Sequence, residues 1–539
     1  MDIKEKIKDS IVIALSNINI EMNKENITIE IPKDRKFGDF SSNIALQLSK
    51  ELQKNPREIA ESIIIGIKDD NIDKIEIAGA GFINFYMNSN YLFDNLNEIL
   101  KNKENYGKND LGVGKKINVE YVSANPTGIL HLGTARGASY GDNLCNILQF
   151  SGFEVTREYY INDAGNQIRN LGLSLKARYM ELLKINSEFP EDGYHGKEII
   201  NLAQELILKY NDKALDESDD FFEKIAVDFL LNRIKKDLED FGVSFDVWTS
   251  EKSIYAKGKV KEALEKLKGL NKTYEKDGAI WLKTTDYGDE KDRVLIKNDG
   301  TFTYLMPDIA YHLDKFDRGY DFLVDVFGAD HHGYIERLKA AINALGYDGN
   351  KVDIRILQMV RLLRNKELVR MSKRTGQTVT ISELVEEVGI NAARYFFAMR
   401  SLDTQMEFDI DLATKNSNEN PVFYVNYAYS RICSILNTKK LDEIPKKYDI
   451  IDENNAYNIL KKLYEFKDVI KNSALRKEPH LVTNYVYDLA AIFHSYYGIE
   501  KIITDNEKET SEKLALISAV KIVIETSLKL IGVKPKDKM

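Results

Sequence analysis

The chain has 539 residues, 43% of them hydrophobic and 30% charged, and its net charge is −9. A chain of this length is too long to fold around one hydrophobic core, which predicts about two to four domains. The composition is that of a soluble globular protein. The two cysteines, Cys145 and Cys433, form no CxxC pair, which excludes a disulfide framework and a thiolate zinc site.

Neither a targeting segment nor a membrane span is predicted. The start, Met1–Lys8, spreads charges through an amphipathic pattern and lacks the apolar centre of a signal peptide. The most apolar late segment, 514–533, is interrupted by three charged residues, so it predicts a packed helix. These features predict a cytoplasmic protein without membrane association.

Residues 1 to about 105 predict a small α+β unit. Residues 27–32 alternate as a strand, 41–52 show helical apolar spacing, and 75–87 predict two strands around a glycine turn. The polar stretch 101–110 indicates a linker, which places the first domain boundary near residue 105.

From residue 116 the pattern changes to strand–helix–strand. Strands are predicted at 116–122 and 154–160, with a helix at 131–151 between them. Such alternation predicts a parallel sheet with right-handed crossovers, as in doubly wound, Rossmann-like domains. The helical pattern at 166–241 predicts an insertion between the two halves of that sheet.

The sheet resumes after a predicted hairpin. Its turn is Asn298-Asp-Gly300, between strands at 293–297 and 301–305. An apolar strand at 321–328 then leads into another helix start, which supplies the second half of the sheet.

From about residue 383 the chain predicts helices joined by loops near 403–421 and 437–452. The fold class is therefore multidomain α/β. A doubly wound parallel-sheet domain follows a small α+β domain and precedes an all-α domain. The predicted domains are 1–105, 116–382 with a helical insertion at about 166–241, and 383–539.

One segment carries the most functional information. Asn125-Pro-Thr-Gly-Ile-Leu-His-Leu-Gly-Thr134 joins a buried strand to a Gly-rich helix, with His131 in the first helical turn. Backbone N–H groups at a helix start attract phosphate, and small residues let a nucleotide approach closely. The segment therefore predicts one part of a nucleotide site.

Two later segments also suit a nucleotide. Gly328-Ala-Asp-His-His332 ends an apolar strand, where a carboxylate binds ribose hydroxyls and glycine leaves room for the base. Val369–Gly376 is a basic loop whose Lys373 would meet a polyphosphate. Each segment by itself is more often a helix cap, a core element or a solvated loop. Their order on a doubly wound pattern favours a nucleotide-handling enzyme.

This arrangement resembles the class I aminoacyl-tRNA synthetases. His131-Leu-Gly-Thr134 and Arg370-Met-Ser-Lys373 stand where the two signature tetrapeptides of that class belong. Further segments, spread over essentially the whole chain, are similar to the arginyl-tRNA synthetase branch. These segments are 38–43, 79–84, 120–128, 160–168, 328–334, 371–376, 420–428 and 431–435.

The resemblance implies a two-step ligation in translation. L-Arginine and ATP give arginyl-adenylate and pyrophosphate, with Mg²⁺ on the polyphosphate, and arginine then passes to the terminal ribose of tRNA(Arg). Members of the family generally require bound tRNA for the first step. No protein-ligated metal and no protein partner are expected, and the chain is expected to act as a monomer.

The signatures imply an ATP site. His131 and Lys373 take the catalytic roles, because they would stabilise charge on the phosphate oxygens. Two positions depart from the family pattern. Thr134 replaces a histidine and can donate a hydrogen bond without carrying charge, whereas Arg370 replaces a lysine and keeps its charge. The implied ATP-binding residues are His131, Gly133, Thr134, Gly328, Asp330, Met371, Ser372 and Lys373.

The resemblance also implies an arginine pocket. A guanidinium is a planar fork of donors that needs carboxylate or phenolic acceptors, which assigns Asp308 and Tyr304 to it. Ser123 and Asn125 are assigned to the amino-acid backbone groups. An alternative leaves Asp308 as a helix cap next to proline. The implied pocket residues are Glu120, Ser123, Asn125, Tyr304, Asp308 and His331.

By resemblance, the helical C-terminal domain binds the anticodon and the N-terminal unit touches the tRNA elbow. Phe82 and Asn84 are the expected elbow contacts. Aromatic residues such as Tyr424 and Tyr427 could stack on bases, although their helical spacing is typical of core positions.

Three other functions fit parts of the sequence. A class I synthetase for another amino acid, such as cysteine, is disfavoured because cysteine-specific sites use a thiolate-bound zinc. A non-catalytic tRNA-binding paralogue would have degenerate signatures, yet His131, Gly133 and Lys373 are in place. A simple nucleotidylyltransferase would not explain the long helical region after the basic loop.

Overall fold

The computed structural model describes residues 3–32, 34–369, 379–451 and 453–539, apart from the side chains of 35, 330–332 and 453–455. Within these residues no helix is both long and apolar enough to span a membrane. The chain divides into two compact units. Unit 1 comprises Met1–Lys103, Lys440–Tyr464 and Ile499–Ala519, and unit 2 comprises Glu104–Lys439, Glu465–Gly498 and Val520–Met539.

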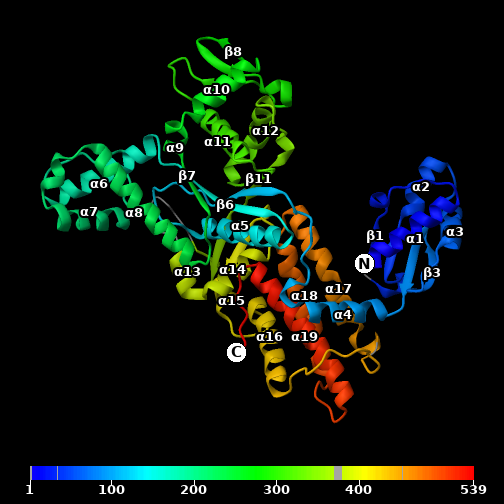
Figure 1. Ribbon diagram of the computed structural model, residues 1–539. Coiled ribbons are helices and arrows are strands. Elements are labelled where there is room, and N and C mark those ends of the chain that lie inside the picture. Colours follow the sequence, from blue (N-terminus) through cyan, green and yellow to red (C-terminus); the bar gives the residue numbers. More distant parts are fainter. Residues whose placement is uncertain (1–2, 33, 370–378, 452) are drawn as a thin grey trace. The chain divides into compact units, whose positions relative to one another are not determined.

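Unit 1 contains an antiparallel sheet in the order β1-β2-β4-β3 (Figure 1). The predicted strand pair around a glycine turn is confirmed as β3 and β4, whereas the strand predicted at 27–32 shrinks to the two residues of β1. The elements are α1 (Ile3–Asn17), β1 (Ile29–Glu30), β2 (Phe40–Ser42), α2 (Ile44–Leu52), α3 (Pro56–Gly66), β3 (Ile72–Ala78), β4 (Phe82–Met87) and α4 (Asn90–Asn102).

Unit 2 is built around a parallel sheet in the order β12-β11-β5-β6-β7 (Figure 1). The chain runs from β5 outward to β6 and β7, and then returns to the opposite side of β5 through β11. Ligands bind at the carboxyl ends of strands where the order reverses in this way. The doubly wound prediction is confirmed. The strands are β5 (Lys116–Glu120), β6 (Glu154–Ile161), β7 (Val247–Ser250), β11 (Phe322–Gly328) and β12 (Val352–Leu357).

Helix α5 (Leu132–Phe150) follows β5 and is buried along most of its length. Two of its charged residues are buried as well, and both have partners. Arg136 donates to the carbonyl oxygens of Gln358, Ser401 and Thr404, at 2.9, 2.6 and 2.9 Å. Asp142 accepts from Arg394 of α14 (Ile390–Ala398) at 2.5 Å. These contacts fix the helix that carries the first signature.

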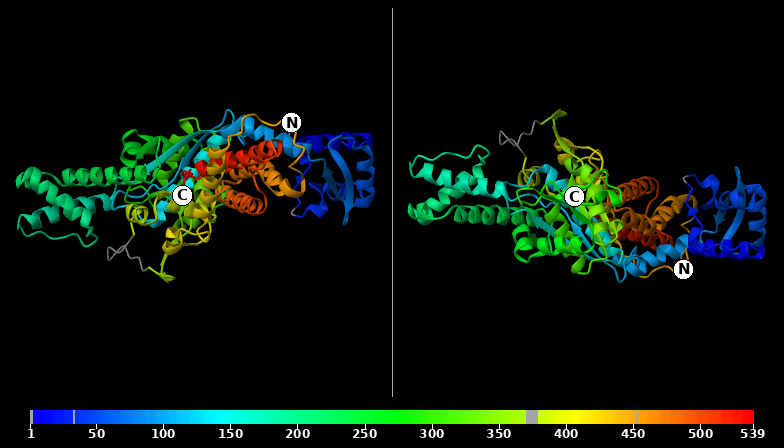
Figure 2. Two further views of the ribbon diagram at one scale, coloured as in Figure 1. Left: turned by 90° about the horizontal axis from the view of Figure 1, so that it is seen from below. Right: turned by 90° about the horizontal axis from the view of Figure 1, so that it is seen from above.

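The segment 166–241 is helical as predicted, but it is inserted between β6 and β7, within one half of the sheet, and not between the two halves. Its three helices pack on one another around a core of their own, which includes Leu171, Leu175 and Phe222. Figures 1 and 2 show the helices lying side by side. They are α6 (Asn166–Leu182), α7 (Lys197–Tyr210) and α8 (Asp219–Asp240).

A second insertion follows β7 and contains a small antiparallel sheet in the order β10-β9-β8. The sequence predicted only β10. The strand predicted at 301–305 is reduced to a single bridge between Ile296 and Phe302. Helix α11 begins at Leu305 instead, because Pro307 in a first helical turn sacrifices no hydrogen bond. The elements are α9 (Glu251–Ala256), α10 (Lys259–Gly269), β8 (Thr273–Lys276), β9 (Ala279–Leu282), β10 (Arg293–Ile296) and α11 (Leu305–Asp317).

From about residue 383 the described chain is mostly helical, as predicted, but the segment predicted as a loop near 403–421 contains the strand β15 and the helix α15. β15 pairs in parallel with β13, in a sheet of order β14-β13-β15. The remaining elements are α12 (Ile335–Ala344), β13 (Val360–Arg364), β14 (Glu367–Leu368), α13 (Ile381–Val388), β15 (Met406–Asp409), α15 (Ile410–Thr414), α16 (Pro421–Thr438), α17 (Glu453–Arg476), α18 (His480–Ile499) and α19 (Glu507–Leu530).

Gly141→Ala tests the close packing of α5 against the sheet. A Cβ atom at Gly141 would lie 2.1 Å from Cγ of the buried Tyr121 ring, so the ring must move, at a cost of about 1–3 kcal/mol. The thermal unfolding midpoint should fall. Gly137→Ala is the matched control, because its Cβ would meet only the flexible end of Leu357 at 3.2 Å and alanine favours helix. Equal midpoints for the two variants would contradict this packing.

Candidate active site

The backbone is strained directly after β5. Val122 has φ +69° and Ser123 has φ +37°, and the Ser123 N–H donates to the Tyr121 carbonyl at 3.0 Å. A positive φ is costly for a β-branched residue and persists only where surrounding contacts enforce it. Here the turn directs Ser123 Oγ back to the strand, where it donates to Glu120 Oε1 at 2.9 Å and accepts from the Tyr160 N–H at 3.1 Å. Strain of this kind marks a candidate site at the sheet edge.

His131 is the N-cap residue of α5. Its Nδ1 accepts from the Gly133 N–H at 3.1 Å, so Nδ1 carries no proton in this arrangement. Thr134 completes a capping box. Its hydroxyl accepts from the His131 N–H at 2.9 Å and donates to the His131 carbonyl at 2.6 Å. The Thr134 hydroxyl proton is therefore committed to the helix start.

The second signature, including Met371, Ser372 and Lys373, lies outside the described residues. The chain that follows it is anchored beside the first signature. The Leu132 N–H donates to the Val379 carbonyl, and the Ile381 N–H donates to the Leu130 carbonyl, both at 3.2 Å. Since these two bonds bracket His131, the described chain resumes at Val379 next to the start of α5.

The third nucleotide segment lies on the other side of the strand-order reversal. Gly328 ends β11, the direct neighbour of β5, and residues Ala329–Tyr334 form a short 3₁₀ helix. The side chains of Asp330 and His331 lie outside the described part of the chain. The backbone places this segment at the carboxyl edge where β5 also ends.

Asp308 lies one turn inside α11 and accepts from the Tyr334 hydroxyl at 2.5 Å. The cap position belongs to Tyr304, so the alternative that Asp308 caps its helix is wrong. The Tyr304 side chain itself is 89% exposed. Asn125, another residue of the predicted pocket, is half-buried and donates through its amide to Gln167 Oε1 at 2.7 Å.

Two residues that the sequence did not identify face Asp308. Glu251 is the first residue of α9, directly after β7, and it is hydrogen-bonded to the hydroxyl of Tyr160 at the end of β6. Burial raises the pKa of Glu251, and the nearby carboxylate of Asp308 raises it further. Burial, and then Glu251 and Asp308, likewise raise the pKa of Tyr160.

The same electrostatic pattern holds at Tyr334. Burial and then Asp308 raise the pKa of its hydroxyl. Carboxylates and phenols thus converge here with excess negative potential, which stabilises a bound cation. The sequence signal for Glu251 was weak, because β7 was not predicted and a lone acidic residue in a helical stretch is usually solvated.

Glu120 is buried beneath the strained turn. Its Oε1 accepts from Ser123, and its Oε2 lies 2.6 Å from the Lys315 ammonium group of α11. Hydrogen bonds therefore link three groups of residues: Glu120 with Ser123, His131 with Gly133 and Thr134, and Asp308 with Tyr334. All three groups belong to elements at the carboxyl edge of the sheet.

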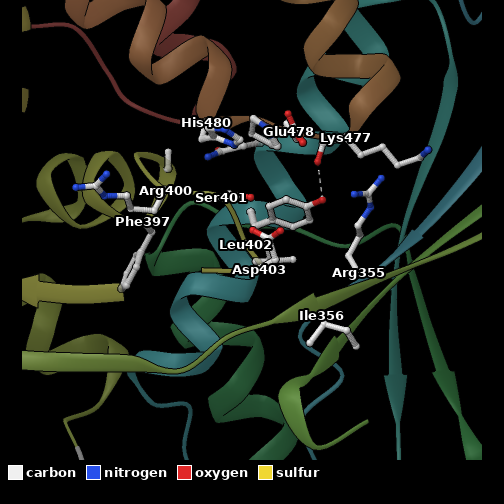
Figure 3. A pocket seen from close by; sticks show the side chains of 14 residues that line it. Arg355, Ile356, Phe397, Arg400, Ser401, Leu402, Asp403, Lys477, Glu478 and His480 are labelled. Carbon is white, nitrogen blue, oxygen red and sulfur yellow. Dashed lines mark hydrogen bonds between the residues drawn. The ribbon is translucent and has the colours of Figure 1, made fainter. Parts of the chain in front are cut away.

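A separate cavity of about 60 Å³ lies among α5, β12, the segment 397–403 and the turn between α17 and α18 (Figure 3). Its lining includes Tyr140, whose hydroxyl donates to the Lys477 carbonyl at 2.8 Å. It contains none of the predicted site residues. Ligand pockets usually measure several hundred Å³, so this cavity does not fit a nucleotide.

Three family models match successive parts of the chain. The model of the arginyl tRNA synthetase N terminal domain matches residues 2–87. The model described as tRNA synthetases class I (R), catalytic domain, matches 95–410. The DALR anticodon binding domain model matches 425–539.

Full-length relatives are also found. The chain is 49% identical to the arginine–tRNA ligase of Bacillus pumilus, covering 100% of this chain and 99% of the relative. It is 50% identical to that of Listeria monocytogenes, covering 99% and 98%. The structure of Thermus thermophilus arginyl-tRNA synthetase aligns with a TM-score of 0.79 at 20% identity, over 99% of this chain and 100% of that one, which shows a shared fold.

Thr134→Val tests the capping box. The substitution keeps the side-chain shape but removes both hydrogen bonds to His131, so stability should fall by about 1 kcal/mol. For a large unit this corresponds to a midpoint lower by roughly 2–4 °C in calorimetry. Thr134→Ser keeps the hydroxyl and should retain the wild-type midpoint. A Val variant as stable as the Ser variant would show that the hydroxyl does not stabilise the helix start.

Proposed function

The chain belongs to the arginyl-tRNA synthetase family, and from this premise we propose how its residues share the work of charging tRNA. It is an aminoacyl-tRNA ligase that uses ATP and attaches arginine to tRNA in translation. The observation that carries the assignment of residues is the electronegative pocket of Asp308, Glu251, Tyr160 and Tyr334 beside the signature helix.

We assign the substrate guanidinium to this pocket. Its planar fork has donors for two carboxylates at once, and Asp308 and Glu251 supply them. The Tyr160 and Tyr334 hydroxyls already bond these carboxylates and so orient them. Tyr304, which precedes α11 and is exposed, is positioned at the start of the same helix to add a phenolic acceptor.

We assign the amino-acid backbone groups to the segment after β5. Glu120 would face the α-ammonium group, and Ser123 and Asn125 would orient the amino and carboxylate groups. His331 completes this proposed set. The strained turn at Val122 supports the assignment, because it holds Ser123 against Glu120.

For ATP, we assign the phosphates to the start of α5 and the second signature. His131 and the N–H groups near Gly133 meet the phosphates, while Thr134 maintains their geometry through the capping box. Gly328 and Asp330 take the base and ribose. The remaining proposed contacts come from Met371, Ser372 and Lys373.

The first chemical step is a substitution at phosphorus. An oxygen of the arginine carboxylate attacks the α-phosphorus of ATP, and the bond to the pyrophosphate oxygen breaks. Negative charge grows on the phosphate oxygens, where His131, the helix N–H groups and Lys373 would stabilise it. A ribose hydroxyl of the tRNA terminus then attacks the adenylate carbonyl, and AMP leaves. The pyrophosphate exchange rate of Lys373→Ala measures the contribution of that lysine.

We propose Mg²⁺ as a counter-ion on the ATP phosphates, since it binds phosphate oxygens and retains several waters. Among the described residues there is no cluster of three or more His, Cys, Asp or Glu that could hold a metal. The proposal therefore rests on the chemistry of the polyphosphate. We further propose that the enzyme acts as a monomer in the cytoplasm.

We propose that residues 1–105, 116–382 and 383–539 act as the elbow-contacting, catalytic and anticodon-binding domains. The order of the family models supports this division. Phe82 is 41% exposed and suits an elbow contact, whereas Asn84 is buried and accepts from Ser41 at 2.7 Å. Among the C-terminal aromatics, Tyr424 and Tyr427 are only partly buried and are the better candidates for stacking.

ATP–pyrophosphate exchange, run with each amino acid and with or without tRNA, tests the proposed function. Exchange should occur with arginine alone, because only its guanidinium satisfies the paired carboxylates. It should also require tRNA, as the family generally does. Exchange with another amino acid would overturn the assigned pocket, and no exchange under any condition would favour a non-catalytic tRNA-binding protein.

Asp308→Asn and Glu251→Gln test the guanidinium assignment. Each change removes one carboxylate, so KM for arginine should rise by roughly 30-fold or more while KM for ATP stays the same. Because each also relieves repulsion between two half-buried acids, the thermal midpoint should not fall. Glu262→Gln, an acidic residue in the first turn of α10, is the control. An unchanged arginine KM in both variants would refute the assignment.

A further inference from the structure

Three carboxylates stand side by side in the interior of the parallel sheet. The register pairs Asp325 of β11 with Glu120 of β5, and Glu120 with Glu158 of β6. Residues at one register position point to the same face of a sheet, so the three acids form a row. Their exposures are 0%, 6% and 0%, respectively. Buried charges in such a row require countercharges.

Helix α11 supplies these countercharges from one face. His312, Lys315 and Arg318 are spaced three residues apart and therefore lie along one side of the helix. The Lys315 Nζ is 2.6 Å from Glu120 Oε2 and 2.7 Å from Asp325 Oδ1. Arg318 contacts both oxygens of Glu158 at 2.9 Å. Lys315 is fully buried, so it has no role at the surface.

His312 completes the row as a cation. Its Nδ1 lies 2.8 Å from the Asp308 carbonyl, and its Nε2 lies 2.9 Å from Asp325 Oδ2. A carbonyl and a carboxylate can only accept, so both ring nitrogens must donate and the ring is an imidazolium. Burial lowers the pKa of His312, but Asp325 outweighs it and raises the pKa. Three cations then balance three carboxylates.

Glu120 connects this row to the substrate pocket. One of its oxygens accepts from Lys315 and the other from Ser123. We propose that Lys315 is a positioning residue for arginine binding, whose buried ammonium group holds Glu120 charged and oriented toward the α-ammonium group of the substrate. The inference rests on the proposed role of Glu120.

The charge balance around Glu120 supports this role. Burial raises the pKa of Glu120, Lys315 opposes that rise, and the neighbouring Asp325 and Glu158 add to it. Burial lowers the pKa of Lys315, yet Asp325 and Glu120 outweigh it and raise the pKa. Without Lys315, Glu120 would lose the cation that opposes protonation and would bind a proton at higher pH.

The test is Lys315→Met in the full-length enzyme, assayed by pyrophosphate exchange with tRNA. KM for arginine should rise by roughly tenfold where the pKa of Glu120 in the variant lies one unit above the assay pH, because only about a tenth of Glu120 is then charged, and KM for ATP should be unchanged. Because protonated Glu120 no longer attracts an ammonium group, the raised KM should fall as pH increases from about 6 to 9. Lys315→Arg keeps the charge and should restore most of the affinity.

Lys513→Met is the matched control for a merely structural lysine. Lys513 is also buried and binds two carboxylates, Glu500 and Glu509, each at 2.8 Å, but it belongs to unit 1. This variant should lower the thermal midpoint and leave the arginine KM and its pH profile unchanged. The same result for Lys315→Met would overturn the proposal.

The double variant Glu120→Gln with Lys315→Met shows whether Lys315 acts through Glu120. It removes one charge of each sign, which limits the loss of stability. If Lys315 acts through Glu120, the double variant should have the arginine KM of Glu120→Gln alone. Multiplying effects would overturn the proposal. An unchanged arginine KM in Glu120→Gln alone would instead refute the proposed role of Glu120. This outcome differs from multiplying effects, which refute only the role of Lys315.

Discussion

Charge pairing between α11 and the parallel sheet determines where the proposed arginine pocket lies. Asp325, Glu120 and Glu158 are buried side by side on adjacent strands. Burying an unpaired charge there would cost several kcal/mol of folding free energy. Helix α11 must therefore cross the strands with its basic face inward. That placement fixes Asp308, one turn upstream of His312, at the carboxyl edge of the sheet. The ion pairs and the position of the proposed guanidinium pocket are consequences of one packing arrangement.

The start of α5, to which we assign the ATP phosphates, is held mainly by contacts of the backbone. The capping box of His131 and Thr134 sets the first turn of α5, and the bonds at Val379 and Ile381 return the chain to that turn after the second signature. Arg136 ties the same helix to three carbonyl oxygens deeper in the unit. The described chain thus resumes, after the second signature, beside the helix start that carries the first one.

The proposed guanidinium pocket contains interactions that are unfavourable in the absence of a bound cation. The charge of Asp308 raises the pKa of Glu251, and the hydrogen bond from Tyr160 only partly offsets this effect. In the proposed role, a guanidinium would supply the missing positive charge and the donors together. Binding would then depend on charge and geometry at once and would exclude amino acids that carry neither. The strained backbone at Val122 is a second local cost at the same site.

Sequence by itself determined the doubly wound sheet, the helical insertion, the three nucleotide segments and the family, because these depend on periodicity and on contiguous motifs. It also indicated Glu120, Ser123 and Asp308 through resemblance. Tertiary structure decided what each of them contacts. The register that aligns Asp325, Glu120 and Glu158, and the arrival of Glu251 from β7, join residues that are up to about two hundred positions apart. Such pairings depend on strand order and helix docking, which no local pattern in the chain encodes.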